Sequence, residues 1–188
     1  MAKKSVKISN EYCPQTLFLY GTKNEDGSPD FGLFCWATYA WNDGLCFLTC
    51  IGENKRTKDN LLRNRAFSAN LVTEKLLPLA DYFGNTSGSD PNKMHIDVQI
   101  EQGKALDVPV LTDSPVCFEL EVIDVYPQGN GSDVILSRIK SVLHDEELPE
   151  ETAPEALQKI APARALPGKY FGFDGKFLGN WGELQMRK

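Results

Sequence analysis

The sequence predicts a mainly β protein, an antiparallel β-barrel with short helical additions. Segments rich in strand-forming residues are separated by hairpin signals, of which Asp26-Gly27 and Asp43-Gly44 are the clearest. Few of these segments are joined through helices, so parallel βαβ units are scarce. Counting the segments gives about six or seven strands, which favours an antiparallel barrel. The length of 188 residues suits one domain, spanning residues 1–188.

Three antiparallel strands are expected near the start of the chain, at residues 16–22, 31–41 and 45–51. The first two contain many aromatic and other strand-forming residues. The third is apolar on both faces, as in a central strand that is buried on both sides. The opening of the chain therefore predicts two consecutive hairpins.

Two short helices are expected on either side of a fourth strand at residues 67–73. The first helix covers residues 57–66, and Thr57 has the character of its N-cap residue. The second helix covers residues 74–84 and is expected to end at Gly84.

A polar loop at residues 85–93 follows the second helix and contains Gly, Ser and Pro. Loops of this composition and length often serve as lids or binding loops. The last residue of the loop, Lys93, is expected to be solvated rather than to reach a phosphate.

The clearest half-buried strand lies at residues 116–126, where polar and apolar residues alternate. This alternation places the apolar side chains toward a core and places Glu119 and Glu121 toward water. A turn then leads into residues 134–143, so the two segments are expected to form a long hairpin. Further on, an acidic, Pro-interrupted region contains one short helical piece, and the aromatic, Gly-rich residues 170–184 are expected to pack over a flat surface.

The charge of the chain argues against some classes of partner. The formal net charge is -6, so the protein lacks the general positive field that nucleic-acid binding requires. No apolar run approaches the length of a membrane span, and the basic start has no apolar stretch behind it. We therefore expect a cytoplasmic protein that binds neither nucleic acid nor membrane.

The residues that could carry other chemistry lack the necessary spacing. The 5 cysteines include no C-x-x-C pair and are interpreted as reduced thiols. The 2 histidines do not lie at ligand spacing from another His or Cys, so no metal site is expected. Ser87-Gly88-Ser89 lacks the G-x-S-x-G pattern of a serine hydrolase, and no Walker motif is present.

The stretch after the third strand has the parts of a phosphate-monoester site. The buried strand ends at Ile51, the chain turns at Gly52, and Lys55 and Arg56 bring two positive charges. Thr57 can contribute its hydroxyl where the free N–H groups of a helix begin. The alternative is that Thr57 only caps the helix while Lys55 and Arg56 are solvated.

Several motifs occur together in a recognisable order. They are the first hairpin with its acidic-Gly turn, K-x-T-x-x-N-L at residues 55–61, F-x-x-N at 67–70, A-D-x-F-G-x-x-S-G at 80–88 and DEEL at 145–148. In these features the chain resembles the flavin reductase-like family of FMN-binding split-barrel proteins, which includes flavoredoxin-type proteins. The resemblance covers roughly residues 15–150, leaving 151–188 as a C-terminal extension.

This resemblance implies a homodimer with FMN near the subunit interface. The phosphate would lie at Lys55, Arg56 and Thr57, and the flavin ring would lie against the second strand. The implied cofactor-binding residues are Phe34, Cys35, Trp36, Ala37, Thr38, Cys50, Gly52, Lys55, Arg56, Thr57, Asn70, Asp81, Ser87 and Gly88. No catalytic residue is expected, because a nicotinamide can pass hydride to a flavin without a protein acid or base.

The resemblance further implies an NAD(P)H-dependent flavin oxidoreductase, with NADH or NADPH as the electron donor. One alternative is an FMN-binding electron carrier that is reduced by a redox protein partner, with which the acidic surface is compatible. Another is a barrel of this fold that binds a different ligand, or none, and serves only in assembly.

Overall fold

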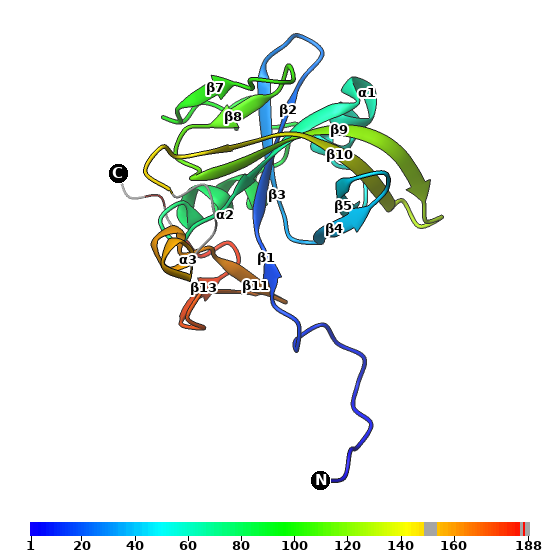
Figure 1. Ribbon diagram of the computed structural model, residues 1–188, viewed down its shortest axis with the longest axis vertical. Helices are drawn as coiled ribbons and strands as arrows, with labels where there is room; N and C mark the ends of the chain where they lie inside the picture. The colour runs from blue at the N-terminus through cyan, green and yellow to red at the C-terminus, as the bar shows by residue number, and fades with distance from the viewer. Residues whose placement is uncertain (149–153, 185, 187–188) are drawn as a thin grey trace.

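The computed structural model describes residues 1–148, 154–184 and 186. Its largest unit is a seven-stranded antiparallel sheet with the strand order β3-β2-β6-β9-β10-β5-β4 (Figure 1). The strands of this sheet are β2 (Phe18–Lys23), β3 (Pro29–Phe34), β4 (Ala37–Trp41), β5 (Leu45–Ile51), β6 (Ala66–Leu71), β9 (Val116–Pro127) and β10 (Asp133–His144). The fold is thus mainly β and antiparallel, as the sequence predicts.

The two edge strands of this sheet, β3 and β4, are consecutive in the chain. The segment predicted as one strand at residues 31–41 is interrupted at Cys35 and Trp36. The reason is that β3 pairs with β2 whereas β4 pairs with β5, at the opposite edge of the sheet. Within the described residues, no ladder joins β3 to β4. The two expected hairpins are therefore present but lie at opposite edges.

The described residues also form two smaller sheets. One has four strands, β1 (Gln15–Thr16), β11 (Arg164–Leu166), β12 (Lys169–Phe171) and β13 (Phe177–Asn180). The other has two, β7 (Ile100–Gln102) and β8 (Pro109–Leu111). The aromatic tail thus contributes the β12–β13 hairpin, and β1 joins the start of the chain to the sheet formed by the tail.

The part of the chain that the structure describes has three helices: α1 (Arg56–Asn64), α2 (Leu77–Asn85) and α3 (Pro154–Ile160). Helix α1 begins one residue earlier than expected, with Lys55 as its N-cap, so Thr57 lies inside the first turn and does not cap the helix. Helix α2 continues through Gly84 to Asn85. Glycine favours close packing on β3 there, since a Cβ at position 84 would stand 3.0 Å from Leu33 Cδ2.

The two larger of the three core clusters in the described residues share strand β2. Leu19 belongs to the cluster beneath α2, whereas Phe18 and Tyr20 belong to the cluster that also contains Leu61 of α1. This division follows from strand geometry, because successive side chains point to opposite faces. Consequently β2 is buried on both faces, and helices α1 and α2 pack into different clusters.

The long hairpin of β9 and β10 is confirmed, but Glu119 does not face water. Its side chain is fully buried and accepts hydrogen bonds from the backbone N–H groups of Lys104, Ala105 and Leu106, at 2.9, 2.9 and 2.7 Å. A buried carboxylate is tolerated when it is hydrogen bonded in this way. Glu119 therefore fastens the turn between β7 and β8 to the main sheet.

All 5 cysteines are free thiols, in agreement with the sequence interpretation. No helix in the described part of the chain has both the length and the apolar character that crossing a bilayer requires.

Candidate functional site

A pocket of about 360 Å³ lies between the end of β3, the start of α1 and the loop that follows α2. It is lined by Gly32, Leu33, Phe34, Asn54, Lys55, Arg56, Thr57, Phe83, Gly84, Asn85, Thr86, Ser87, Gly88, Ser89 and Lys93. We call it the anion pocket, for the reasons given below. Six of the residues expected from the sequence to bind the cofactor line it: Phe34, Lys55, Arg56, Thr57, Ser87 and Gly88.

The first turn of α1 contributes backbone donors to the anion pocket. The first backbone hydrogen bond within the helix runs from Asp59 N to Lys55 O, at 3.0 Å. The N–H groups of Arg56, Thr57 and Lys58 precede this bond and have no acceptor within the helix. They also lie at the positive end of the helix dipole. This end of α1 is therefore suited to an anion.

Two cationic side chains accompany these donors. Lys55 and Arg56 are exposed, and Lys55 makes a loose ion pair with Glu53 at 3.6 Å, with about half of the lysine side chain open to solvent. Exposed pairs of this kind contribute little to stability, so Lys55 is available to an anionic ligand. Opposite them, Ser87 and Ser89 place hydroxyl groups along the loop after α2.

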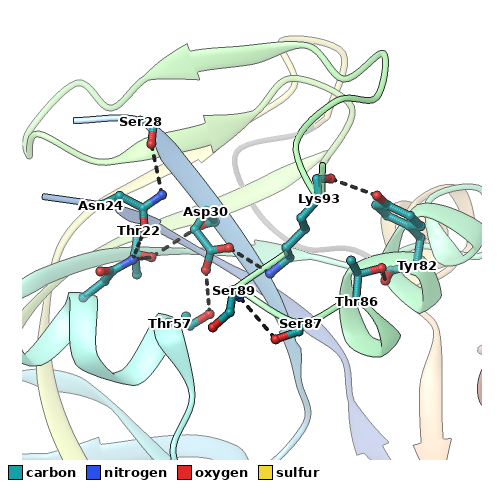
Figure 2. Close-up of polar contacts among 11 residues, drawn as sticks. Thr22, Asn24, Ser28, Asp30, Thr57, Tyr82, Thr86, Ser87, Ser89 and Lys93 are labelled. Carbon is teal, nitrogen blue, oxygen red and sulfur yellow. Dashed lines mark hydrogen bonds and ion pairs between the residues drawn. The ribbon is translucent and has the colours of Figure 1, made fainter. Parts of the chain in front are cut away.

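A buried ion pair lies beside the pocket, and sequence reasoning missed it. Lys93 was expected in solvent, but it is only 4% exposed, and its Nζ lies 2.8 Å from Oδ1 of Asp30. The other carboxylate oxygen of Asp30 accepts a hydrogen bond from Oγ1 of Thr57 at 3.1 Å (Figure 2). The expectation that Lys93 is solvated was therefore wrong. No local signal could have revealed the pair, because 63 residues separate its members.

Helix α1 is held firmly against the sheet by further polar contacts. The Asn60 side-chain amide donates to Thr22 Oγ1 at 3.2 Å and to Asn24 Oδ1 at 2.9 Å, which ties the helix to the β2–β3 hairpin. On another side, Lys58 Nζ pairs with Asp133 at 2.9 Å and donates to the Gly131 carbonyl at 2.6 Å. The start of α1 is thus positioned before any ligand arrives.

Four other expected residues line a second, largely apolar pocket of about 510 Å³. These residues are Trp36, Ala37, Thr38 and Cys50. Asn10 and Gln15 near the start of the chain also line this second pocket. Cys35 is half-buried against the core cluster beneath α2, and Gly52 lies outside both pockets. The last residue of β3 therefore lines one pocket, and the link to β4 reaches the other.

Asn70 and Asp81 lie outside both pockets and bind other parts of the protein. Asn70 is fully buried; it donates to the Leu19 carbonyl at 2.9 Å and accepts from the Leu111 N–H at 2.8 Å. The Asp81 carboxylate accepts from the Tyr170 hydroxyl at 2.7 Å and from the Gly182 N–H at 2.8 Å. Asp81 therefore secures the C-terminal segment to α2.

The chemistry of the anion pocket suits a phosphate monoester. It combines backbone donors, two exposed cations, a buried ammonium group and serine hydroxyls, which are the usual partners of phosphate oxygens. In the part of the chain that the structure describes, no group of three or more His, Cys, Asp or Glu side chains is arranged to hold a metal ion. Since the second pocket is largely apolar, the two together suit a ligand with one anionic end and one flat apolar end.

Comparison with known proteins gives a consistent result. Residues 10–163 match the model of the flavin reductase like domain. The fold is similar to flavoredoxin of Desulfovibrio vulgaris (Miyazaki F), with a TM-score of 0.81, 23% identity, and coverage of 97% of this chain and 98% of that one. The fold is also similar to flavoredoxin from Methanosarcina acetivorans, with a TM-score of 0.78 and 16% identity; the match covers 90% of this chain and 91% of that one.

A third similar structure is the FMN-binding protein from Thermus thermophilus with bound p-hydroxybenzaldehyde. Its TM-score is 0.70, with 22% identity and coverage of 100% of this chain and 98% of that one. No curated protein is significantly similar to this chain in sequence. At these identities the structural matches establish a shared fold.

Proposed function

The chain belongs to the flavin reductase like domain family, and from this premise we propose that it is an FMN-binding oxidoreductase with a split-barrel fold. The proposed split lies between β3 and β4, the two edges of the main sheet. The observation that carries the proposal is the meeting of the first turn of α1 with the loop after α2, around a pocket that suits a phosphate monoester. The names of two similar structures, a flavoredoxin and an FMN-binding protein, support the same ligand.

In this proposal the two ends of FMN bind in the two pockets. Lys55, Arg56 and the first-turn N–H groups of α1 hold the phosphate, together with Ser87 and the backbone at Gly88. The flavin ring lies against the link from β3 to β4 and contacts Trp36, Ala37, Thr38 and Cys50. Asn70 and Asp81, which the resemblance also implied, support the surrounding structure from outside the two pockets.

When bound, the flavin supplies hydride and electron transfer. The residues of the chain bind and orient it, and the largely apolar lining of the second pocket suits contact with the ring. No side chain is assigned the role of an acid or base. We propose NADH or NADPH as the donor, by direct hydride transfer.

Reduction by a protein partner is the second candidate. The net charge of -6 favours it, since an acidic surface promotes encounter with a basic partner. Five free cysteines fit a reducing compartment such as the cytoplasm.

We also propose a homodimer, formed over the exposed edge strand β4. Large apolar side chains gather there: Trp36, Tyr39 and Leu45 are each about half exposed, and Trp41 is 79% exposed. Exposed aromatic clusters of this kind mark protein interfaces. Sedimentation of the wild type should give a dimer, and Trp41→Glu should shift it toward monomer; a monomeric wild type contradicts this arrangement.

The central experiment is a visible absorption spectrum of the purified protein after incubation with FMN and desalting, followed by anaerobic addition of NADH or NADPH. A retained flavin that is bleached promptly by one nucleotide supports the reductase and identifies its donor. A retained flavin that neither nucleotide reduces supports the partner-reduced carrier. A protein that neither retains FMN nor turns it over with either nucleotide contradicts the proposed function.

A further inference from the structure

We propose that Asp30 is an internal anion that competes with the phosphate of the ligand for Thr57 and Lys93, and so limits how tightly the ligand is held. This inference rests on the proposed function, because it concerns the same anion pocket. It assigns a role to a carboxylate that neither the sequence motifs nor the pocket lining include.

The geometry of Asp30 is that of an anion already in place. Asp30 is only 2% exposed. Its Oδ1 accepts from Lys93 Nζ at 2.8 Å, and its Oδ2 accepts from Thr57 Oγ1 at 3.1 Å (Figure 2). Both donors line the anion pocket, whereas Asp30 lies behind them. A ligand phosphate entering the pocket would therefore meet two groups that already bind a carboxylate.

The environment keeps both donors close to Asp30. Lys93 is fixed through its backbone, since its carbonyl accepts from the Tyr82 hydroxyl at 3.0 Å, and its Nζ lies 5.8 Å from the centre of the Phe83 ring. Thr57 is held next to β3 because Gly32 has no side chain; a Cβ there would stand 2.7 Å from Thr57 Oγ1. The three groups therefore remain together in the absence of a ligand.

Asp30 already occupies the hydroxyl hydrogen of Thr57 and the positive charge of Lys93, which a phosphate would also use. An ionised carboxylate only accepts hydrogen bonds, so Thr57 directs its hydroxyl hydrogen at Asp30 and away from a ligand. The hydroxyl that the sequence predicts to serve the phosphate is thus already engaged by Asp30 in the absence of a ligand. The Lys93 charge is balanced by Asp30 before any phosphate enters. Once phosphate binds, Asp30 remains a second negative charge nearby, which opposes binding.

The test compares FMN with riboflavin, which lacks the phosphate. Dissociation constants for both are measured by flavin fluorescence in the wild type and in Asp30→Asn, and the ratio Kd(riboflavin)/Kd(FMN) reports the contribution of the phosphate. Removing the competing charge should raise this ratio by about tenfold or more. A purely structural role of Asp30 would change stability and both affinities together, leaving the ratio unchanged. An unchanged or smaller ratio overturns the inference.

Asp26→Asn is the matched control. It makes the same change of charge in the same hairpin, but the Asp26 carboxylate is exposed to solvent and accepts hydrogen bonds from nearby Ser28. Because solvent screens this exposed charge, the ratio Kd(riboflavin)/Kd(FMN) of Asp26→Asn should stay within about twofold of the wild-type ratio. If the wild type binds neither flavin, the proposed function itself fails, and this result is distinct from an unchanged ratio.

A measurement on the wild type covers the case in which Asp30→Asn does not fold. In protein labelled with ¹⁵N-lysine, the ammonium signal of Lys93 is identified by its absence from Lys93→Arg. Saturation with FMN should shift this signal, whereas saturation with riboflavin should leave it nearly in place. The same spectrum with both flavins would overturn the inference.

Discussion

Gly88 packs so closely on Arg56 that a Cβ atom at position 88 would overlap with the Cβ of the arginine. Gly88 lies in the loop after α2 and Arg56 begins α1, so this contact sets the separation of the two walls of the anion pocket. The φ angle of Gly88 is not in the left-handed region, and space alone requires glycine here.

Replacing Gly88 with alanine should therefore separate the loop from α1. We expect Gly88→Ala to weaken FMN binding by about 1 to 2 kcal/mol, in line with the cost of overpacking elsewhere. Riboflavin binding, which does not use the phosphate, should change much less. Fluorescence titration of both flavins checks this, together with thermal unfolding to confirm the fold. Equal losses for the two flavins would contradict a role of Gly88 in the anion pocket.

Loss of the Lys55 charge should also weaken FMN binding. Lys55→Ala should cost about 1 to 2 kcal/mol of FMN affinity at low salt, because a charge-assisted contact with the phosphate is lost. The effect should shrink as ionic strength rises. Lys169→Ala, which removes an exposed charge on β12, is the control and should bind FMN like the wild type. Unchanged FMN affinity in Lys55→Ala would remove Lys55 from the proposed site.

Lys58 should contribute to the stability of the fold rather than to binding of the anionic ligand. Its side chain is 8% exposed and that of its partner Asp133 is 15% exposed, so Lys58→Met leaves a largely buried carboxylate without its cation. We expect a loss of about 3 kcal/mol in the free energy of unfolding, measured by urea titration. Lys140→Met is the comparison, since its pair with Glu121 is much more exposed and should cost less than about 1 kcal/mol. Similar losses in the two variants would contradict this difference.

Cys117 should make stability depend on pH in the alkaline range. Burial raises the pKa of the Cys117 thiol from its ordinary value of 9.0 to about 11. Because the folded state holds this proton more tightly, its contribution to stability is complete below pH 9 and is lost as pH rises toward 11. Between about pH 8 and pH 10 we expect a decrease of about 1 kcal/mol. Urea unfolding should show a flatter dependence in Cys117→Ala, and an equal slope in both proteins would contradict the assignment.

The parts of the fold that sequence predicted well depend on short-range signals. The Asp26-Gly27 and Asp43-Gly44 turns, the long β9–β10 hairpin and the presence of helix α1 each follow from residues close together in the chain. The residues around Lys55 and Gly88 could therefore be placed near helix and loop boundaries in advance. That they face each other across one pocket is a result of the fold.

The remaining features arise from partners distant in sequence. Lys93 and Glu119 looked like solvated charges, since neither the carboxylate of Asp30 nor the N–H groups of residues 104–106 are close to them in the chain. The break after β3 could not be predicted either, because it reflects which strands β3 and β4 pair with. Gly84 resembled a helix terminator, but its role depends on Leu33 of another element.

The two-residue link between β3 and β4 joins the linings of two pockets, so the two ends of one ligand could bind cooperatively. Phe34 lines the anion pocket and Trp36 lines the apolar one, so in the proposed binding mode a ligand held at one end would present its other end to the second pocket at high effective concentration. The equilibrium constants of the two ends then multiply. Under the proposed function, a modest loss at either end would be enough to turn a ligand that stays through many reaction cycles into one that is exchanged with the solution between them.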